Sequence, residues 1–140
     1  MILVDTNVLV GFAGRRDGLH RRVVADLKTL ARRDLFVTSP VLAETFHLLT
    51  TGPERARARA FVESFGLRPW PNADAPAIWA YVFEWMAKYA EHSPDWADGH
   101  LVALTDADRS AKVWTYDREF VRLWRRLDGS AVPLAIRRRD

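Results

Sequence analysis

The chain has no cysteine among its 140 residues. Disulfide bonds, zinc sites built from thiolates and cysteine nucleophiles are therefore excluded. It also has no apolar run that approaches the roughly 20 residues a membrane-spanning helix needs. The first residues, Met-Ile-Leu-Val-Asp, lack the basic region that opens a signal peptide. These absences predict a cytoplasmic protein without a membrane partner.

Paired histidine ligands are missing as well. The four histidines stand at positions 20, 47, 92 and 100, and the pattern His-Glu-x-x-His does not occur. A catalytic zinc site is therefore disfavoured. The length predicts one domain over residues 1–140, long enough to bury a substantial core.

Short apolar segments typical of buried strands alternate with segments whose apolar residues recur at helical spacing. Strands are predicted at residues 1–4, 35–38, 67–70, 112–116 and 131–136, and helices at residues 19–33, 39–49, 54–65, 75–89 and 95–108. Ser39 and Asp74 are the expected N-caps of two of these helices. The alternation predicts an α/β fold around a mainly parallel sheet.

Four acidic residues stand beside apolar segments, namely Asp5, Glu44, Asp98 and Asp117. A buried carboxylate is costly unless it is paired, hydrogen-bonded or bound to a metal. Two of them directly follow predicted strands, and the other two lie in early turns of predicted helices. Because ligands bind beyond the carboxyl ends of parallel strands, one site at that edge can collect all four.

Carboxylates gathered in one site repel one another and take up protons unless a cation balances them. Magnesium and manganese prefer oxygen ligands, and two such ions can promote phosphodiester hydrolysis without a side-chain nucleophile. We therefore predict that the four acids are catalytic and hold Mg²⁺ or Mn²⁺. Asp95, three residues before Asp98, is either a fifth ligand or the N-cap of its helix.

Two polar residues are predicted to support the acidic residues. The Asn7 amide can donate a hydrogen bond to Asp5, or it can cap the helix that follows. The Thr115 hydroxyl can orient Asp117, or it can be an ordinary strand threonine. Such supporting partners fix the geometry of metal-binding carboxylates.

Positive charge is concentrated near the end of the sequence. The net charge is +3, and residues 118–140 contain seven arginines but only three acids. A basic segment beside an acidic cluster suits a polyanionic substrate held near a metal. Arg15, Arg16 and Arg118 are candidate contacts to the phosphates of such a substrate, with a solvated surface as the alternative for any single arginine.

The ordered motifs resemble the PIN-domain nucleases, and the small VapC-like toxins in particular. The resemblance rests on Asp-Thr-Asn at 5–7, Glu44 in an apolar helix, Pro-Asp-Trp-Ala-Asp at 94–98 and Thr-Tyr-Asp at 115–117. It implies a three-layer α/β/α fold and a metal-dependent endoribonuclease whose ions are held by the four acids. It further implies a homodimer, an RNA substrate and a small antitoxin protein of a type II toxin–antitoxin system.

One departure from the family pattern is the pair Gly99-His100, where the family more often has alanine and a small or apolar residue. His100 is a candidate phosphate contact, with an ordinary surface histidine as the alternative. Among the six tryptophans, spacing assigns Trp79 and Trp85 to the core. Trp96 and Trp124 are left as candidates for stacking on RNA bases.

Other functions remain open from the sequence. A phosphatase with Asp5 as nucleophile would need an aspartate where Asn7 stands. A PIN-like RNA-processing nuclease without an antitoxin, or an inactive module that binds nucleic acid or protein, would share the fold. A test of metal-dependent RNA cleavage separates these alternatives.

Overall fold

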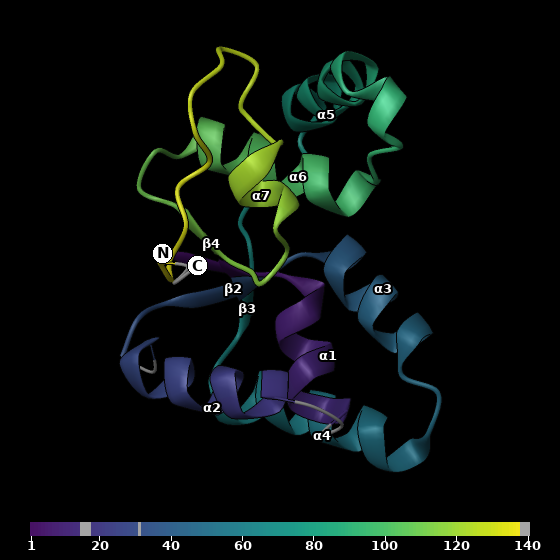
Figure 1. Cartoon of the computed structure of the whole chain (residues 1–140), viewed down its shortest axis with the longest axis vertical. Helices are drawn as coiled ribbons and strands as arrows, with labels where there is room; N and C mark the ends of the chain where they lie inside the picture. Colours follow the sequence, from purple (N-terminus) through teal and green to yellow (C-terminus); the bar gives the residue numbers. More distant parts are fainter. Residues whose placement is uncertain (15–17, 31, 138–140) are drawn as a thin grey trace.

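A computed structural model describes residues 1–14, 18–30 and 32–137 of the chain, as strands and helices in alternation (Figure 1). The elements in order are β1 Ile2–Val4, α1 Thr6–Gly14, α2 Gly18–Leu30, β2 Leu35–Val37, α3 Ser39–Leu48, α4 Gly52–Ser64, β3 Arg68–Pro69, α5 Pro76–Lys88, the 3₁₀ turn η1 Ala90–His92, α6 Trp96–Ala107, β4 Lys112–Trp114 and α7 Glu119–Arg122. No helix in this described part is long and apolar enough to cross a membrane.

The four strands form one sheet in the order β3-β2-β1-β4. Every pairing between them is parallel, with Leu3 opposite Phe36 on one side and Val113 on the other. Helices α1 to α4 lie on one side of the sheet and α5 to α7 on the other (Figure 1). The predicted α/β fold with a mainly parallel sheet is therefore confirmed, and it has three layers.

The central strand β1 is buried along its whole length. The sequence of such a strand is a continuous apolar run, because helices cover both faces of a parallel sheet. The neighbouring β2 is buried in the same way. Beyond the sheet, the core continues into α6, whose residues 99–105 are all buried.

Three local expectations are wrong. The N-cap of α3 is Thr38 rather than Ser39, because the Thr38 hydroxyl accepts the hydrogen bond from the Val41 backbone. Asp74 does not cap α5, which begins after Ala75 without a side-chain cap. Residues 131–136 form no full strand and contribute only isolated bridges, of which one joins β4 in parallel.

Gly99 permits the close approach of α6 to α5. A Cβ atom at this position would lie 2.8 Å from Trp85 Cε3 and 3.0 Å from Val82 Cγ1. Both of these side chains are fully buried and have little room to move. The glycine that departs from the family pattern is thus required by the packing of this chain.

We expect Gly99→Ala to lower the free energy of unfolding by about 1–3 kcal/mol, because the added methyl overpacks the α5–α6 contact. The gain in helix propensity, up to about 1 kcal/mol, opposes this effect but is smaller. Gly52→Ala at the start of α4 is the matched control, since a Cβ there meets nothing within 4 Å. Urea denaturation of both variants measures the difference, and equal stabilities would contradict the packing argument.

Candidate acidic active site

Asp5 lies directly after β1 and is buried, with 4% of its surface exposed. Its Oδ1 accepts a hydrogen bond from the Thr6 backbone N–H at 2.7 Å. Its Oδ2 accepts one from the Thr115 hydroxyl at 2.7 Å and a longer one from the Asn7 amide at 3.3 Å. These donors fix the carboxylate in one orientation at the carboxyl edge of the sheet.

Thr115 and Asn7 link the ends of β1 and β4. The Asn7 amide also donates to the Thr115 hydroxyl at 3.1 Å, and its Oδ1 accepts from the Tyr116 backbone at 3.0 Å. The expected support of Asp5 by Asn7 is therefore present. The Thr115 hydroxyl orients Asp5 rather than the Asp117 carboxylate, because it donates to Asp5 and accepts from the Asp117 backbone N–H at 3.0 Å.

Asp98 lies in the first turn of α6, and Asp95 is the N-cap of that helix. The Asp95 Oδ1 accepts a hydrogen bond from the Asp98 backbone N–H at 2.8 Å. Of the two roles predicted for Asp95, the cap is present. Because the cap holds an exposed carboxylate beside Asp98, it also adds negative charge to the site.

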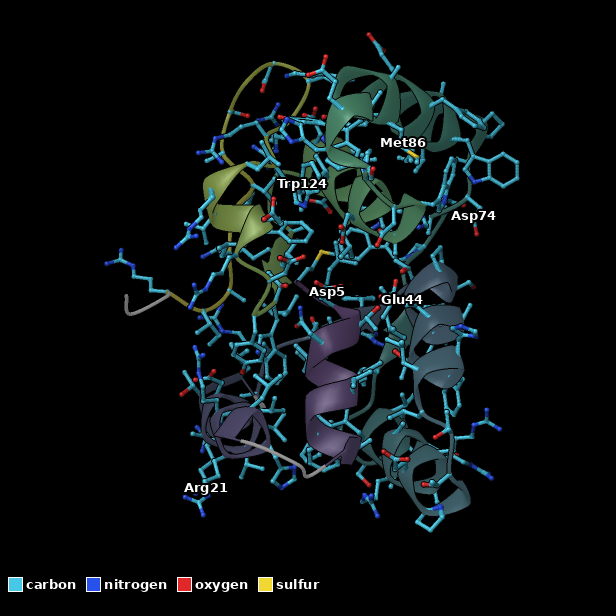
Figure 2. All side chains as sticks on the ribbon, turned by 45° about the vertical axis from the view of Figure 1, so that its right-hand side comes forward. Asp5, Arg21, Glu44, Asp74, Met86 and Trp124 are labelled. Carbon is cyan, nitrogen blue, oxygen red and sulfur yellow. The ribbon has the colours of Figure 1, made fainter. Side chains whose placement is uncertain are left out.

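Glu44 and Asp117 complete the set as half-buried residues on α3 and after β4. The Asp117 Oδ1 accepts from the Glu119 backbone at 2.9 Å, which orients it at the start of α7. Figure 2 shows Asp5 and Glu44 on the same part of the molecule, where α1 and α3 on one side meet α6 on the other.

The pKa shifts show that the four carboxylates interact. Burial, followed by the charges of Asp95, Asp5, Asp117 and Glu44, raises the pKa of Asp98 to about 9. Burial also raises the pKa of Asp5 to about 6 despite its hydrogen bonds, and the pKa of Glu44 rises for the same cause and from acidic neighbours. The fold thus gathers negative charge in a desolvated place.

These carboxylates do not form a closed cage. Among residues 1–14, 18–30 and 32–137, no three histidine, aspartate or glutamate side chains meet as ligands of one ion. The carboxylates are within electrostatic reach of one another but are not drawn together. This arrangement suits an ion that keeps most of its water and takes few direct protein ligands, as Mg²⁺ does.

Basic side chains flank one end of the site. Arg22 lies over the ring of Tyr116, 4.9 Å from its centroid, and both line a narrow cleft together with Asp117. The Tyr116 hydroxyl donates a hydrogen bond to Asp26 at 2.6 Å, a contact between residues far apart in sequence that no local pattern predicts. Arg118 is exposed beside Asp117. The predicted contacts Arg15 and Arg16 lie outside the described residues.

The expectation that His100 contacts phosphate is wrong, and so is the surface alternative. Its side chain is fully buried, and Nε2 lies 2.7 Å from the Ala73 carbonyl oxygen. No local pattern predicts this burial, because the partner of the ring is a loop residue that lies 27 positions earlier in the sequence.

The tryptophan assignment is also partly wrong. Trp124 is buried with 3% exposed, so it cannot stack on RNA, whereas Trp79 on α5 is 48% exposed and not in the core. Trp96 is half-buried against Phe83, with 5.1 Å between ring centroids.

Asp98 provides a pH test of this electrostatic picture. Its pKa of about 9 exceeds the ordinary value of 3.8, so the folded protein holds a proton that the unfolded chain has lost. Its contribution to stability is fully present below about pH 4 and is lost as the pH rises to about 9. We expect Asp98→Asn in EDTA to raise the melting temperature near pH 9 and to change it little near pH 4.

Calorimetry across this pH range measures the effect. Glu91→Gln removes an exposed acid on η1 and is the matched control, with no comparable dependence on pH. A melting-temperature difference for Asp98→Asn that stays constant with pH would contradict the raised pKa.

Solved structures share this fold. VapC20 from Mycobacterium tuberculosis, described as a sarcin-ricin loop cleaving toxin, matches with a TM-score of 0.69 and 21% identity over 86% of this chain and 93% of that one. FitAcB from Neisseria gonorrhoeae matches with a TM-score of 0.53 and 27% identity over 84% of this chain and 88% of that one. FitAB bound to an IR36 DNA fragment matches with a TM-score of 0.54 and 28% identity over 84% and 85%.

Comparison with curated proteins found no match. The sequence profile of the PIN domain, however, matches residues 2–125, which include all four carboxylates and both supporting residues. The chain belongs to the PIN domain family.

Proposed function

We propose that the chain is a Mg²⁺- or Mn²⁺-dependent endoribonuclease and the toxin of a type II, VapBC-like toxin–antitoxin system. In this proposal residues 1–140 form one nuclease domain. Asp5, Glu44, Asp98 and Asp117 are its catalytic and metal-binding residues, and Asn7 and Thr115 position them. The family membership supports a nuclease, while the metal, the RNA substrate and these roles are the proposal.

One observation carries the proposal, namely the acidic cluster in which Asp98 has a pKa of about 9. A strongly perturbed carboxylate surrounded by other acids is a feature of functional sites rather than of cores. Within the described part of the chain, the groups that donate hydrogen bonds to the Asp5 carboxylate are all neutral. A hard divalent cation would remove the repulsion and return these groups to the charged state.

The donor set fits such an ion. All ligating atoms are carboxylate oxygens, which suit magnesium and manganese better than softer metals. When bound, the ion would supply Lewis-acid stabilisation of the charge that develops at phosphorus. Asp5 and Asp98 are the ligands we expect to contact it most directly, with Glu44 and Asp117 acting through water.

The chain's own groups perform the remaining tasks. Thr115 and Asn7 hold Asp5 in one rotamer, so the carboxylate need not reorganise when substrate arrives. The burial of Asp5 and the partial burial of Asp98 lower the local dielectric, which strengthens the electrostatic interactions in the site. Arg22 and Arg118, at the Asp117 end, are placed to attract the phosphate backbone on either side of the cut.

The named neighbours support the partner assignments. VapC20 is described as a sarcin-ricin loop cleaving toxin, and the FitAB structure contains a bound DNA fragment. By analogy we propose a small antitoxin partner for this chain, and from the resemblance to the VapC-like toxins we propose a homodimer. The exposed side chains of Trp79 and Phe83 on α5 are an apolar surface open to such partners.

Two alternatives share the fold, namely an RNA-processing PIN nuclease without an antitoxin and a module that has lost activity. Growth arrest on expression in bacteria, relieved by a small open reading frame adjacent to the gene, would favour the toxin. Cleavage without toxicity would favour the processing enzyme. The presence of all four carboxylates weighs against an inactive module.

We expect RNA cleavage that requires Mg²⁺ or Mn²⁺ and stops in EDTA. Asp5→Asn and Asp98→Asn should each lower the rate about 100-fold or more, since each removes a charge that balances the ion. Glu91→Gln, with the same change of charge on the surface, should cleave like the native protein. Thermal unfolding of each variant checks its fold. Normal cleavage by both aspartate variants would show that the site lies elsewhere.

Thr115 tests whether the support of Asp5 matters for metal binding. The hydrogen bond that its hydroxyl donates to Asp5 lowers the pKa of that carboxyl. Thr115→Val removes that donor, and we expect the affinity for Mn²⁺ to fall about 10–100-fold. The lower limb of the pH–rate profile should also move to higher pH. Thr115→Ser keeps the hydroxyl and is the matched control. Equal Mn²⁺ affinities for the two variants, measured by calorimetry, would rule out this positioning role.

A further inference from the structure

A cavity of about 500 Å³ lies beside the acidic cluster, at the carboxyl ends of β2 and β3. Its walls are the start of α3 and the loop that leads from β3 to α5, and they include Ser39, Leu42, Trp70, Asn72 and Asp74. None of the four acidic site residues lines it. A cavity of this size falls within the range that holds small ligands.

The cavity and the acidic cluster share one edge of the sheet. Strand β2 is the parallel neighbour of β1, so the cavity beyond β2 lies beside Asp5 at the end of β1. Helix α3 contributes Ser39 and Leu42 to the cavity and Glu44 to the cluster. Figure 2 shows Asp74 near the start of α3, on the same side of the molecule as Glu44.

The cavity walls combine apolar surface with hydrogen-bonding groups. Trp70 and Leu42 provide apolar surface, while Asn72 and Asp74 provide polar groups. One Asp74 oxygen accepts from Trp79 Nε1 at 3.1 Å, and no other group in the described part of the chain donates a hydrogen bond to this carboxylate. The second oxygen is therefore available to a ligand that carries N–H groups.

This chemistry favours a nucleobase over a phosphate group. The cavity adjoins four acids and contains a fifth in Asp74, so an anion would be repelled. An unpaired RNA base is flat, mostly apolar and uncharged, with donors on its Watson–Crick edge, and proteins read such bases in just this kind of pocket. Guanine has two adjacent N–H donors on that edge, both of which the free Asp74 oxygen can accept, whereas the same edge of adenine carries only one such group beside an acceptor.

The loop that carries Asp74 is joined to α6, the helix that bears Asp98, by a hydrogen bond. His100 is two residues beyond Asp98 on α6, and its Nε2 is 2.7 Å from the carbonyl oxygen of Ala73. The ring is fully buried, so this contact is shielded from water. Asp98 and the cavity wall are thus held in one fixed relation by a single rigid element.

We propose that this cavity is a nucleobase subsite, which binds an unpaired base adjacent to the phosphate at the acidic cluster. Asp74 accepts N–H donors from the Watson–Crick edge of that base, and guanine is the preferred ligand. The inference rests on the proposed ribonuclease function, and it explains how the enzyme would select the RNA sequence that it cuts.

Cleavage of an RNA pool with a randomised single-stranded segment tests the subsite, with the cut positions read by sequencing. The native protein should show a preference for guanine at one position flanking the cut. Asp74→Asn, which replaces one acceptor by a donor, should reduce that preference about tenfold. Glu91→Gln should retain it. A preference that is absent, or that Asp74→Asn leaves unchanged, would overturn the subsite while the nuclease assignment stands.

A binding measurement tests the subsite even if no RNA is cleaved. Guanosine and adenosine lack phosphate, so their binding to the metal-free protein reports the base alone, by tryptophan fluorescence or NMR. Guanosine should bind more tightly than adenosine, and Asp74→Asn should remove the difference. Binding of inorganic phosphate that excludes the nucleosides would overturn the proposal in favour of an anion site, and so would failure of both nucleosides to bind.

Discussion

The parallel register of β1 and β4 is the constraint on which the site depends. Val4 pairs with Trp114, and the Asp5 backbone N–H donates to the Trp114 carbonyl at 3.0 Å. Asp5 and Thr115 therefore leave the sheet together, and their side chains meet at 2.7 Å. A slip of one residue would turn either side chain to the opposite face. The apolar residues of both strands, buried on both faces, make such a slip costly.

This register places the Asp5 carboxylate at a position where it does not stabilise the folded state. Asp5 is buried among neutral donors, and its neighbours on α3, on α6 and after β4 are also acidic. A chain selected only for stability would place apolar or paired residues here, because charges that repel in a desolvated site destabilise the folded state. The site is thus a local violation of folding rules, supported by the surrounding packing, and such violations are expected where a protein acts on something else.

The sequence predicts the parts of this structure that depend on local pattern. Acids that follow apolar strands indicated the carboxyl edge, and the position of Asp95 three residues before Asp98 left two roles, of which the N-cap is observed. What local pattern could not predict depends on partners distant in the chain. His100 is polar, yet it is buried with its Nε2 against the Ala73 carbonyl, a partner distant in the sequence. In α5, apolar residues occur all around the helix, so their spacing assigned both Trp79 and Trp85 to the core, although only Trp85 is buried.

Contacts between residues distant in the sequence also connect the acidic site to the neighbouring cavity. Helix α6 holds Asp98 at its start and, through His100, holds the loop that forms one wall of the neighbouring cavity. Helix α3 bears Glu44 and forms another wall. A base bound in that cavity would fix the distance between itself and the phosphate at the cluster, because neither wall can move without moving a carboxylate. Selectivity in such an arrangement comes from position as much as from affinity, since a base that does not fit leaves its phosphate displaced from the acidic residues.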